Sequence, residues 1–170
     1  MYFLETDRIA LRRFNLSDSE FVLELWNDPD YITNVADRGI RTSADAVKYI
    51  AEKLLPNSNE KGFGPYLVES LETRTAIGFV GLFKRENIVD QDIGFAFLAS
   101  FRGKGYALEA AKLLEYYGCT TLGLRKINGF TSVANQKSIN VLLKLGMSYQ
   151  KSFHMEGYEG DTRQYSKIYK

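Results

Sequence analysis

The sequence predicts a mixed α/β (α+β) fold, in which a mostly antiparallel central sheet of about six or seven strands is flanked by about four helices. Hydrophobic residues recur with the period of two that is typical of strands in some segments, and with helical spacing in others. Short turns between consecutive strands indicate antiparallel pairs, whereas strand–helix–strand segments indicate parallel crossovers. With 170 residues, of which 45% are hydrophobic, the chain is expected to form one domain, residues 1–170, with a sizeable core.

The first part of the chain is expected to contain one strand and the start of a helical region. Residues 8–14 alternate and predict the first strand. Ser17, with Glu20 three residues later, has the spacing of a capping box that opens the first helix, and Pro29 ends it. Residues 30–42 are polar and mixed in character, so they are expected to form a loop.

Beyond this loop, two further segments of helix and a series of strands are expected. Ser43 is expected to cap the second helix, which Pro56 stops. The remaining expected strands are 64–70, 75–85, 91–100, 126–134, 147–157 and 162–170, and the remaining helices run from 106 to about 123 and from 138 to 145. The predicted order of elements is therefore β-α-α-β-β-β-α-β-α-β-β.

The connection between the strand 91–100 and the following helix has the features of an anion site. Two glycines let the backbone approach a ligand closely, and the helix N-terminus adds partial positive charge and unpaired N–H donors. The side chains of Arg102 and Lys104 add full charges. A phosphate or pyrophosphate would suit this site, although a plain structural turn also explains the glycines. The connection reads Arg102-Gly103-Lys104-Gly105-Tyr106-Ala107.

Two common phosphate-binding motifs do not match this connection. The dinucleotide fingerprint G-x-G-x-x-G needs a third glycine where Leu108 stands. It also needs an acidic residue about 20 positions later, and none occurs between Glu115 and Glu156. The Walker A motif needs Ser or Thr after its lysine, whereas Lys104 is followed by Gly105. A nucleotide-phosphate binder is therefore the least supported interpretation.

A third motif does match. Arg102, Gly105 and Ala107 fit the signature Q/R-x-x-G-x-G/A, and the chain here resembles the GNAT superfamily of N-acetyltransferases. The longer string from Phe101 to Ala110 is similar to the RimJ/RimL-like branch, which acetylates N-terminal amines of ribosomal proteins and many other amines. The resemblance covers nearly the whole chain. It implies the GNAT fold, with a sheet that splays apart at the cofactor strand, and acetyl-coenzyme A as cosubstrate.

The resemblance also implies which residues bind acetyl-coenzyme A. The turn from Arg102 to Ala107 would bind the pyrophosphate. The backbone of Phe97, Leu98 and Ala99 would bind the pantetheine arm in the manner of an added strand, while the side chain of Phe97 is more typical of core. This backbone role does not depend on which side chains the three residues carry.

A second block, residues 135–147, resembles the RimJ/RimL pattern N-x-x-S…K-L-G-F, with Met147 in place of the usual Phe. In the family the Asn, here Asn135, contacts the pantetheine arm. Asn is also among the best residues at a helix N-cap, and the two roles are compatible. Ser138 belongs to the same block and would lie near the same arm.

Acetyl transfer requires that the amine lose a proton, that the oxyanion be stabilised and that the thiolate depart. Many GNAT enzymes use a Tyr seven residues after the Asn as general acid, but Leu142 occupies that position here. In the RimJ/RimL-like branch a Ser at the position of Ser138 is the proposed substitute, although a solvated helix serine fits equally. Tyr149 and Tyr106 are alternative donors. Asp92, where relatives often carry Glu, would accept the amine proton through water, or is simply an exposed charge.

Other reactive residue types carry little signal. His154 is the only histidine and is interpreted as a surface or substrate-groove residue, and Cys119 is interpreted as packing rather than as a nucleophile. No cluster with metal-ligand spacing occurs, so no metal is predicted. Trp26 is more typical of core than of a substrate platform. Carboxylates that could attract a cationic amine, or be ordinary loop charges, are Asp28, Asp30, Asp37, Glu156, Glu159 and Asp161.

Composition limits the partners and the compartment. The net charge is +1, which indicates no broad electrostatic attraction to nucleic acid or to an anionic membrane. A single cysteine excludes an internal disulfide, and no apolar run approaches the roughly 20 residues that cross a bilayer. The N-terminus lacks the layout of a signal peptide, so a cytoplasmic location is expected.

The sequence therefore predicts an acetyl-coenzyme A-dependent N-acetyltransferase that acts on a primary amine. The acceptor would be a protein N-terminal α-amine or a small-molecule amine, and it would attack directly in a ternary complex because no nucleophile for a covalent intermediate is evident. The alternative is a non-catalytic sensor or partner module that binds acyl-coenzyme A, which the missing Tyr at position 142 motivates. A monomer or a homodimer is expected.

Overall fold

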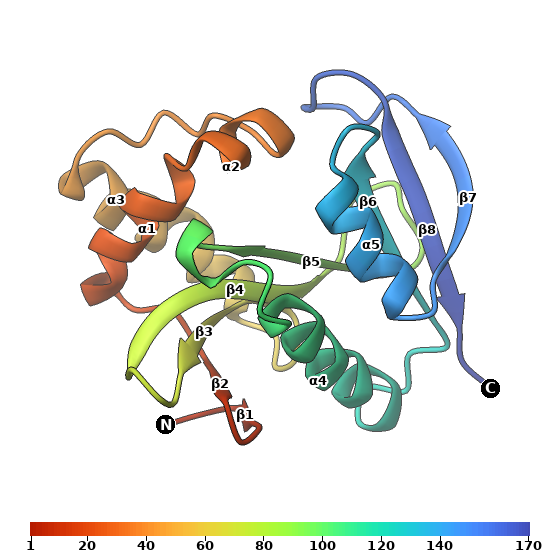
Figure 1. Ribbon diagram of the computed structural model, residues 1–170, viewed down its shortest axis with the longest axis horizontal. Coiled ribbons are helices and arrows are strands. Elements are labelled where there is room, and N and C mark those ends of the chain that lie inside the picture. The colour runs from red at the N-terminus through yellow and green to blue at the C-terminus, as the bar shows by residue number, and fades with distance from the viewer.

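The computed structural model describes residues 1–170, and its strands form one continuous sheet (Figure 1). The sheet has eight strands in the order β1-β2-β3-β4-β5-β6-β8-β7, and only β5 and β6 pair in parallel. The strands are β1 Leu4–Glu5, β2 Ile9–Arg12, β3 Gly64–Ser70, β4 Thr75–Phe83, β5 Asp92–Phe97, β6 Lys126–Ser132, β7 Ser148–Phe153 and β8 Thr162–Ile168. The helices are α1 Ser19–Trp26, α2 Pro29–Asn34, α3 Ser43–Tyr49, α4 Tyr106–Thr120 and α5 Gln136–Lys144. The predicted mixed, mostly antiparallel sheet is confirmed, with β1 and α2 as additional elements.

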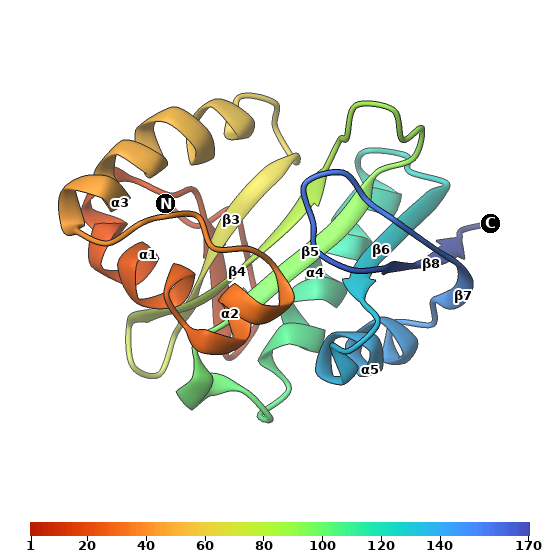
Figure 2. The ribbon, with the colours of Figure 1, turned by 90° about the horizontal axis from the view of Figure 1, so that it is seen from above.

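The alternation of side chains along the central strands divides the core between the two faces of the sheet. Val80 of β4 belongs to a cluster that includes Leu114 of α4, and its neighbour Phe79 belongs to a cluster that includes Trp26 of α1. Successive residues of a strand point to opposite faces. Helices α4 and α5 therefore cover one face and α1 to α3 the other, and Figures 1 and 2 show α1, α2 and α3 grouped apart from α4 and α5.

The first helical segment begins earlier than predicted, because Asn15 takes the cap that was expected at Ser17. The Oδ1 atom of Asn15 accepts a hydrogen bond from the N–H of Ser17 at 2.9 Å. The carboxylate of Asp18 in turn accepts from the N–H of Asn15 at 2.8 Å. This reciprocal capping box opens a short 3-10 turn, Leu16–Asp18, that leads directly into α1.

The second predicted helix is capped by Thr42 rather than by Ser43. The hydroxyl of Thr42 accepts a hydrogen bond from the N–H of Asp45 at 3.1 Å, and the carboxylate of Asp45 accepts from the N–H of Thr42 at 3.0 Å. A second capping box therefore places the start of α3 one residue before the predicted one. The helix continues as a π-helical segment, Ile50–Leu54, before Pro56.

Residues 30–42 are not wholly a loop as predicted, because α2 occupies the first part of this stretch. The carboxylate of Asp28 accepts hydrogen bonds from the N–H groups of Asp30 and Tyr31 at 3.1 and 3.2 Å. Pro29 follows at the first helical position, where its fixed φ suits a helix and its missing N–H costs nothing. The same Asp-Pro pair that ends one helix therefore starts the next.

The other boundaries agree with the predictions to within a few residues. The predicted helix from residue 106 ends at Thr120 rather than near Gly123, and the predicted strand 8–14 is shortened to Ile9–Arg12. Gly146 follows α5 with a φ of +88°, as expected for a residue just after a helix C-terminus. No helix in the structure has both the length and the apolar character that crossing a membrane would require.

The sheet splays between β5 and β6, as the family resemblance implies. Strands β4 and β5 pair from Gly78–Phe97 to Phe83–Asp92, but β5 and β6 share only the pair Asp92–Asn128. Beyond that pair, β5 runs towards the start of α4 and β6 rises towards α5 (Figure 1). The facing backbone edges of the two strands therefore have no strand partner along most of their length.

Candidate active site

A cavity of about 1250 Å³ opens where β5 and β6 diverge. One wall comes from the ends of α1 and α3, the segment between α3 and β3, α2 and the loop after it. The others come from the ends of β4 and β6, the start of β5, α5 and the loop between β7 and β8. Three of the predicted site residues, Asp92, Asn135 and Ser138, line it together. The turn residues 102–107 do not line it. They follow β5 in the chain, at the other end of that strand from Asp92.

The turn that opens α4 has the backbone geometry predicted for an anion site. Gly103 and Gly105 adopt left-handed conformations with φ of +73° and +84°, which favour glycine. The N–H of Arg102 donates to the carbonyl of Ala99 at 3.3 Å, and the next backbone N–H along the chain that donates a hydrogen bond is that of Glu109, to the carbonyl of Gly105 at 3.0 Å. The N–H groups of the first turn of α4 are therefore free to donate to a ligand oxygen.

The charge of Arg102 is not available to an anion in the way the sequence suggested. Its guanidinium donates to the carboxylates of Asp28 and Asp30 at 2.6 and 2.8 Å, and its Nε donates to the carbonyl of Phe97 at 2.9 Å. Arg102 therefore ties the turn to α2 and to the end of β5. Lys104 makes no ion pair, so it carries the free positive charge of the turn.

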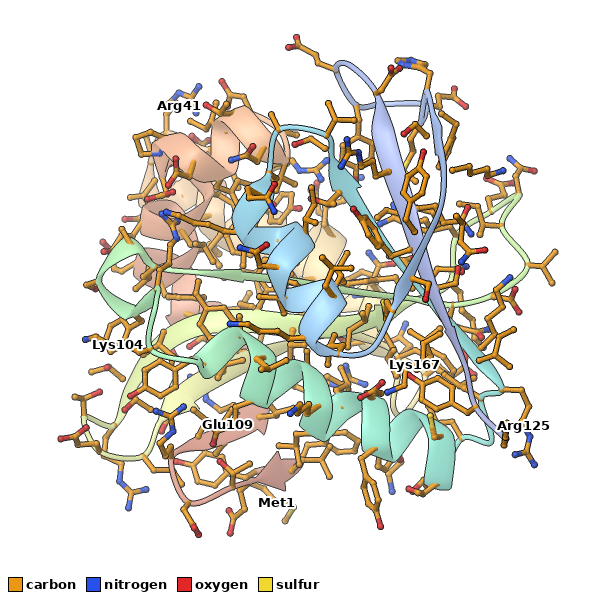
Figure 3. All side chains as sticks on the ribbon, turned by 45° about the vertical axis from the view of Figure 1, so that its right-hand side comes forward. Met1, Arg41, Lys104, Glu109, Arg125 and Lys167 are labelled. Atoms are coloured by element: carbon orange, nitrogen blue, oxygen red, sulfur yellow. The ribbon has the colours of Figure 1, made fainter.

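Arg8, at the residue before β2, holds the turn from the other side, and sequence reasoning missed this role. Its guanidinium donates to the carbonyl of Lys104 at 3.2 Å and, through Nε, to the carboxylate of Glu109 at 2.7 Å. It also lies 4.4 Å from the centre of the Tyr106 ring. Lys104 and Glu109, both labelled in Figure 3, are thus connected through one side chain that is 96 residues away from Lys104 in the sequence.

We expect replacement of Arg8 by Gln to weaken acetyl-coenzyme A binding severalfold, because the carbonyl of Lys104 and the carboxylate of Glu109 lose their shared donor. Thermal stability should change little, since the Arg8 side chain is 46% exposed. Titration calorimetry measures the binding. Lys112→Gln removes the same charge from the exposed face of α4 and is the control. Equal affinities in the wild type and Arg8→Gln would show that the contact does not position the turn.

The backbone at the end of β5 is partly available for an added strand. The N–H of Leu98 donates to the carbonyl of Ile77 in β4 at 2.9 Å, so this group is already used. Alternation along the strand then directs the backbone of Phe97 towards the open edge that faces β6. The carbonyl of Phe97 accepts a hydrogen bond from Arg102, so only the N–H of Phe97 remains free for a ligand. Ala99 follows the end of the strand and is exposed. The side chains of Phe97 and Leu98 are buried in the core.

The N-terminus of α5 brings Asn135 and Ser138 to the cavity. The Oδ1 atom of Asn135 accepts from the N–H of Ser138 at 3.2 Å, so the N-cap role is confirmed and the amide NH₂ remains free. The hydroxyl of Ser138 has no hydrogen-bond partner in the protein and is therefore free to donate. Leu142 is buried against Gly129, where an added Cβ would come within 2.6 Å of its side chain.

Asp92 is not an exposed charge, because its side chain is only 2% exposed. Its two carboxylate oxygens accept from Nε and Nη2 of Arg85 at 2.7 and 3.1 Å. Burial raises the pKa of the Asp92 carboxyl above its ordinary value, while the ion pair with Arg85 acts in the opposite direction. The carboxylate lines the cavity at the point where β5 and β6 part, and Arg85 lines it beside Asp92.

The two tyrosines proposed as alternative acids are outside the cavity. Tyr149 is half-exposed on β7 and shares a hydrogen bond with Ser152 at 3.0 Å, and Tyr106 is buried against Arg8. The tyrosines that do line the cavity are Tyr31, Tyr49 and Tyr158, which come from α2, α3 and the loop between β7 and β8. No sequence motif marks them, because they meet only in the folded chain.

Three of the six carboxylates that could form an acidic entrance or be ordinary loop charges are neutralised by arginines. Asp28 and Asp30 pair with Arg102, and Asp37 pairs with Arg41 at 2.6 Å. Of the six carboxylates, only Asp37 and Glu159 line the cavity.

The remaining reactive residue types lie away from the cavity. His154 is exposed, with Nδ1 at 3.3 Å from the carbonyl of Gly160. Burial raises the pKa of the Cys119 thiol, which fits packing rather than reactivity. No group of three or more metal-ligating side chains occurs.

Comparison with known proteins agrees with this geometry. The sequence profile described as "Acetyltransferase (GNAT) domain" matches residues 8–148. The uncharacterized N-acetyltransferase p20 of Bacillus licheniformis is 29% identical over 164 residues, which cover 92% of this chain and 86% of p20. A GNAT-family acetyltransferase from Bacillus anthracis has a TM-score of 0.82 at 23% identity, covering 99% of this chain and 98% of that one.

A further similar structure was solved with coenzyme A bound. The ribosomal L7/L12 α-N-protein acetyltransferase RimL, in complex with coenzyme A, has a TM-score of 0.81 at 16% identity, covering 99% of this chain and 98% of that one. These structural likenesses establish the fold, which is the GNAT fold. Because the profile extends over most of the chain, including the turn at the start of α4 and the N-terminus of α5, the protein belongs to the GNAT acetyltransferase family and is an N-acetyltransferase.

Proposed function

We propose that the chain transfers an acetyl group from acetyl-coenzyme A to a primary amine by direct attack in a ternary complex. The observation that supports this most is the splay of the sheet. Between the glycine turn and the cavity, the edge of β5 that faces β6 has no strand partner. An extended pantetheine arm would lie along this edge. The motif strings at residues 101–110 and 135–147 further favour the RimJ/RimL-like branch.

The residues present fit coenzyme A. The free N–H groups at the start of α4 and the ammonium of Lys104 would bind the pyrophosphate. The N–H of Phe97 and the amide NH₂ of Asn135 would bind the pantetheine arm from the two sides of the splay. Acetyl-coenzyme A would supply an activated acyl group, a thioester, whose pantetheine end would lie beside Ser138.

Two residues of the cavity are proposed to move or hold protons. The hydroxyl of Ser138 would donate a hydrogen bond to the departing sulfur, since it has no other partner. The carboxylate of Asp92 would accept the proton of the attacking amine through a water molecule, with Arg85 fixing its orientation. Neither role requires a covalent enzyme intermediate.

The test is the release of free coenzyme A from acetyl-coenzyme A over a panel of primary amines. An amine-dependent rate, with acetylated product identified by mass spectrometry, would support the transferase. Binding of acetyl-coenzyme A accompanied only by slow, amine-independent hydrolysis would favour the alternative, a sensor or partner module of the same fold. Tighter binding of ATP or NAD than of coenzyme A would contradict both.

Ser138→Ala should lower kcat about tenfold while leaving the KM for acetyl-coenzyme A nearly unchanged. The lost hydrogen bond is made to a group that gains charge only as the thiolate departs, and one such bond is worth about 1.4 kcal/mol. Steady-state kinetics with one good amine measures the change. Ser138→Thr keeps the hydroxyl and should retain most of the rate, whereas equal rates in Ser138→Ala and the wild type would exclude this role.

A further inference from the structure

Five of the eight charged residues that line the cavity have an ion-pair partner. Lys84 bonds both carboxylate oxygens of Glu60 at 2.7 and 2.8 Å, and Arg85 bonds Asp92. These pairs leave no net charge for a substrate. The lining residues with no ion-pair partner are Arg38, Lys53 and Glu159, so the unpaired charge of the cavity is net positive.

Arg38 differs from the other cations because it lies among hydroxyl groups rather than carboxylates. It follows α2 in the loop that lines the cavity, near Tyr31, Tyr49 and Tyr158. The adjacent carboxylate, Asp37, is already bound by Arg41. Arg38 is exposed and contacts the hydroxyl of Tyr31, but no carboxylate binds it, so its other donors are available for an incoming anion.

The groups around Arg38 are hydrogen-bond donors as well. Burial raises the pKa of Tyr31 to about 12, so its hydroxyl stays protonated at neutral pH. Partial burial lowers the pKa of Arg38, but the tyrosine hydroxyls raise it and give the net upward direction, so the guanidinium stays charged. The indole Nε1 of Trp26, which also lines the cavity, is buried without any partner in the protein.

The same wall is strongly aromatic. The ring of Trp26 lies 5.3 Å from that of Tyr31, 5.8 Å from that of Tyr49 and 5.4 Å from that of Phe79. Phe83 extends this surface along β4 towards Asp92. The cavity thus combines an aromatic surface with the exposed donors of Arg38 and with one buried donor, the indole N–H of Trp26, that lacks an acceptor. A buried donor without an acceptor is costly.

We propose that the amine acceptor of this enzyme also carries a carboxylate on an aromatic or apolar body, and that Arg38 binds this carboxylate. The inference rests on the proposed acetyl transfer and adds the class of substrate. A carboxylate accepts from Arg38 and from nearby hydroxyls, whereas a polyamine would place its second cation against Arg38. The substrates that fit are aromatic amino acids and small molecules of the same design.

The binding test uses the full chain saturated with coenzyme A and two probes that lack an amine, phenylacetate and phenylacetamide. Phenylacetate should bind about tenfold more tightly by calorimetry, because a charged hydrogen bond to Arg38 is lost in the amide. Arg38→Gln should abolish the preference. Lys48→Gln removes the same charge from an exposed position of α3 outside the cavity and should preserve it. Equal affinities for the two probes in the wild type would overturn the proposal.

The turnover test compares tyrosine with tyramine, which differ only in the carboxylate. The wild type should give the higher kcat/KM with tyrosine, and Arg38→Glu should reverse the order because it places a negative charge against the carboxylate. If tyramine is acetylated as well as tyrosine, the substrate class is wrong while the acetyltransferase stands. If acetyl-coenzyme A does not bind, the proposed function itself fails. If neither amine reacts, the probe titration decides the substrate class.

Discussion

Replacing Gly105 by Glu is expected to weaken acetyl-coenzyme A binding by about a hundredfold or more, which titration calorimetry would measure. The new carboxylate would lie among the N–H groups that are free to meet the pyrophosphate, so like charges would oppose each other. The backbone adds to the effect, since a φ of +84° is strained for any residue with a Cβ. A Cβ at this position would lie 3.5 Å from Nη2 of Arg8.

Gly123→Glu provides the matched control for this experiment. Gly123 has a similar φ of +69°, an added Cβ there meets no atom within 4 Å, and it lies beyond the far end of α4. The two variants share the new charge and the backbone strain but not the position. Full binding by a folded Gly105→Glu protein would mean that the turn does not hold the pyrophosphate, and loss in both variants would point to unfolding.

Asp92→Asn should reduce both stability and turnover, for reasons that can be separated. The buried carboxylate accepts two hydrogen bonds from Arg85. Losing its charge should lower the free energy of unfolding by about 2 kcal/mol. This is less than for a fully buried pair, because the side chain of Arg85 is 33% exposed. Urea unfolding measures this loss. If Asp92 also accepts the amine proton, kcat should fall by about a hundredfold, as is typical when a general base is removed.

The double variant Asp92→Asn, Arg85→Gln separates the two effects. Removing both charges leaves no unpaired guanidinium, so much of the lost stability should return. Turnover should remain low if the carboxylate is the proton acceptor. A double variant whose kcat recovers together with its stability would instead show that Asp92 only neutralises the charge of Arg85 and takes no part in the proton transfer.

Local patterns in the sequence were sufficient for the parts of the fold that depend on local forces. The period of two predicted the central strands, and the glycine spacing predicted the turn whose φ values are left-handed. The cap of α3 was misplaced by one residue because Thr42 and Ser43 are adjacent and both suit an N-cap. Helix α2 was missed because Pro29 reads as a helix end, although it is equally suited to the first position of a new helix.

The contacts that define the site could not be predicted from local patterns. Arg102 looked free in its motif, but it is bound by Asp28 and Asp30, which lie 74 and 72 residues away in the sequence. Arg8 reaches Glu109 over 101 residues. The tyrosines of the cavity come from separate elements with no shared motif. Only the tertiary fold determines which charges are neutralised and which remain for a ligand.

The single pair Asp92–Asn128 divides the sheet into two parts, β1 to β5 and β6 to β8. Neighbouring strands within each part are hydrogen-bonded to one another, whereas the two parts share only this one pair. An extended ligand bound between β5 and β6 would hydrogen-bond to both parts of the sheet. Ligand binding would therefore stabilise the fold as well as support the reaction, and the free energy of unfolding would rise with the logarithm of the ligand concentration.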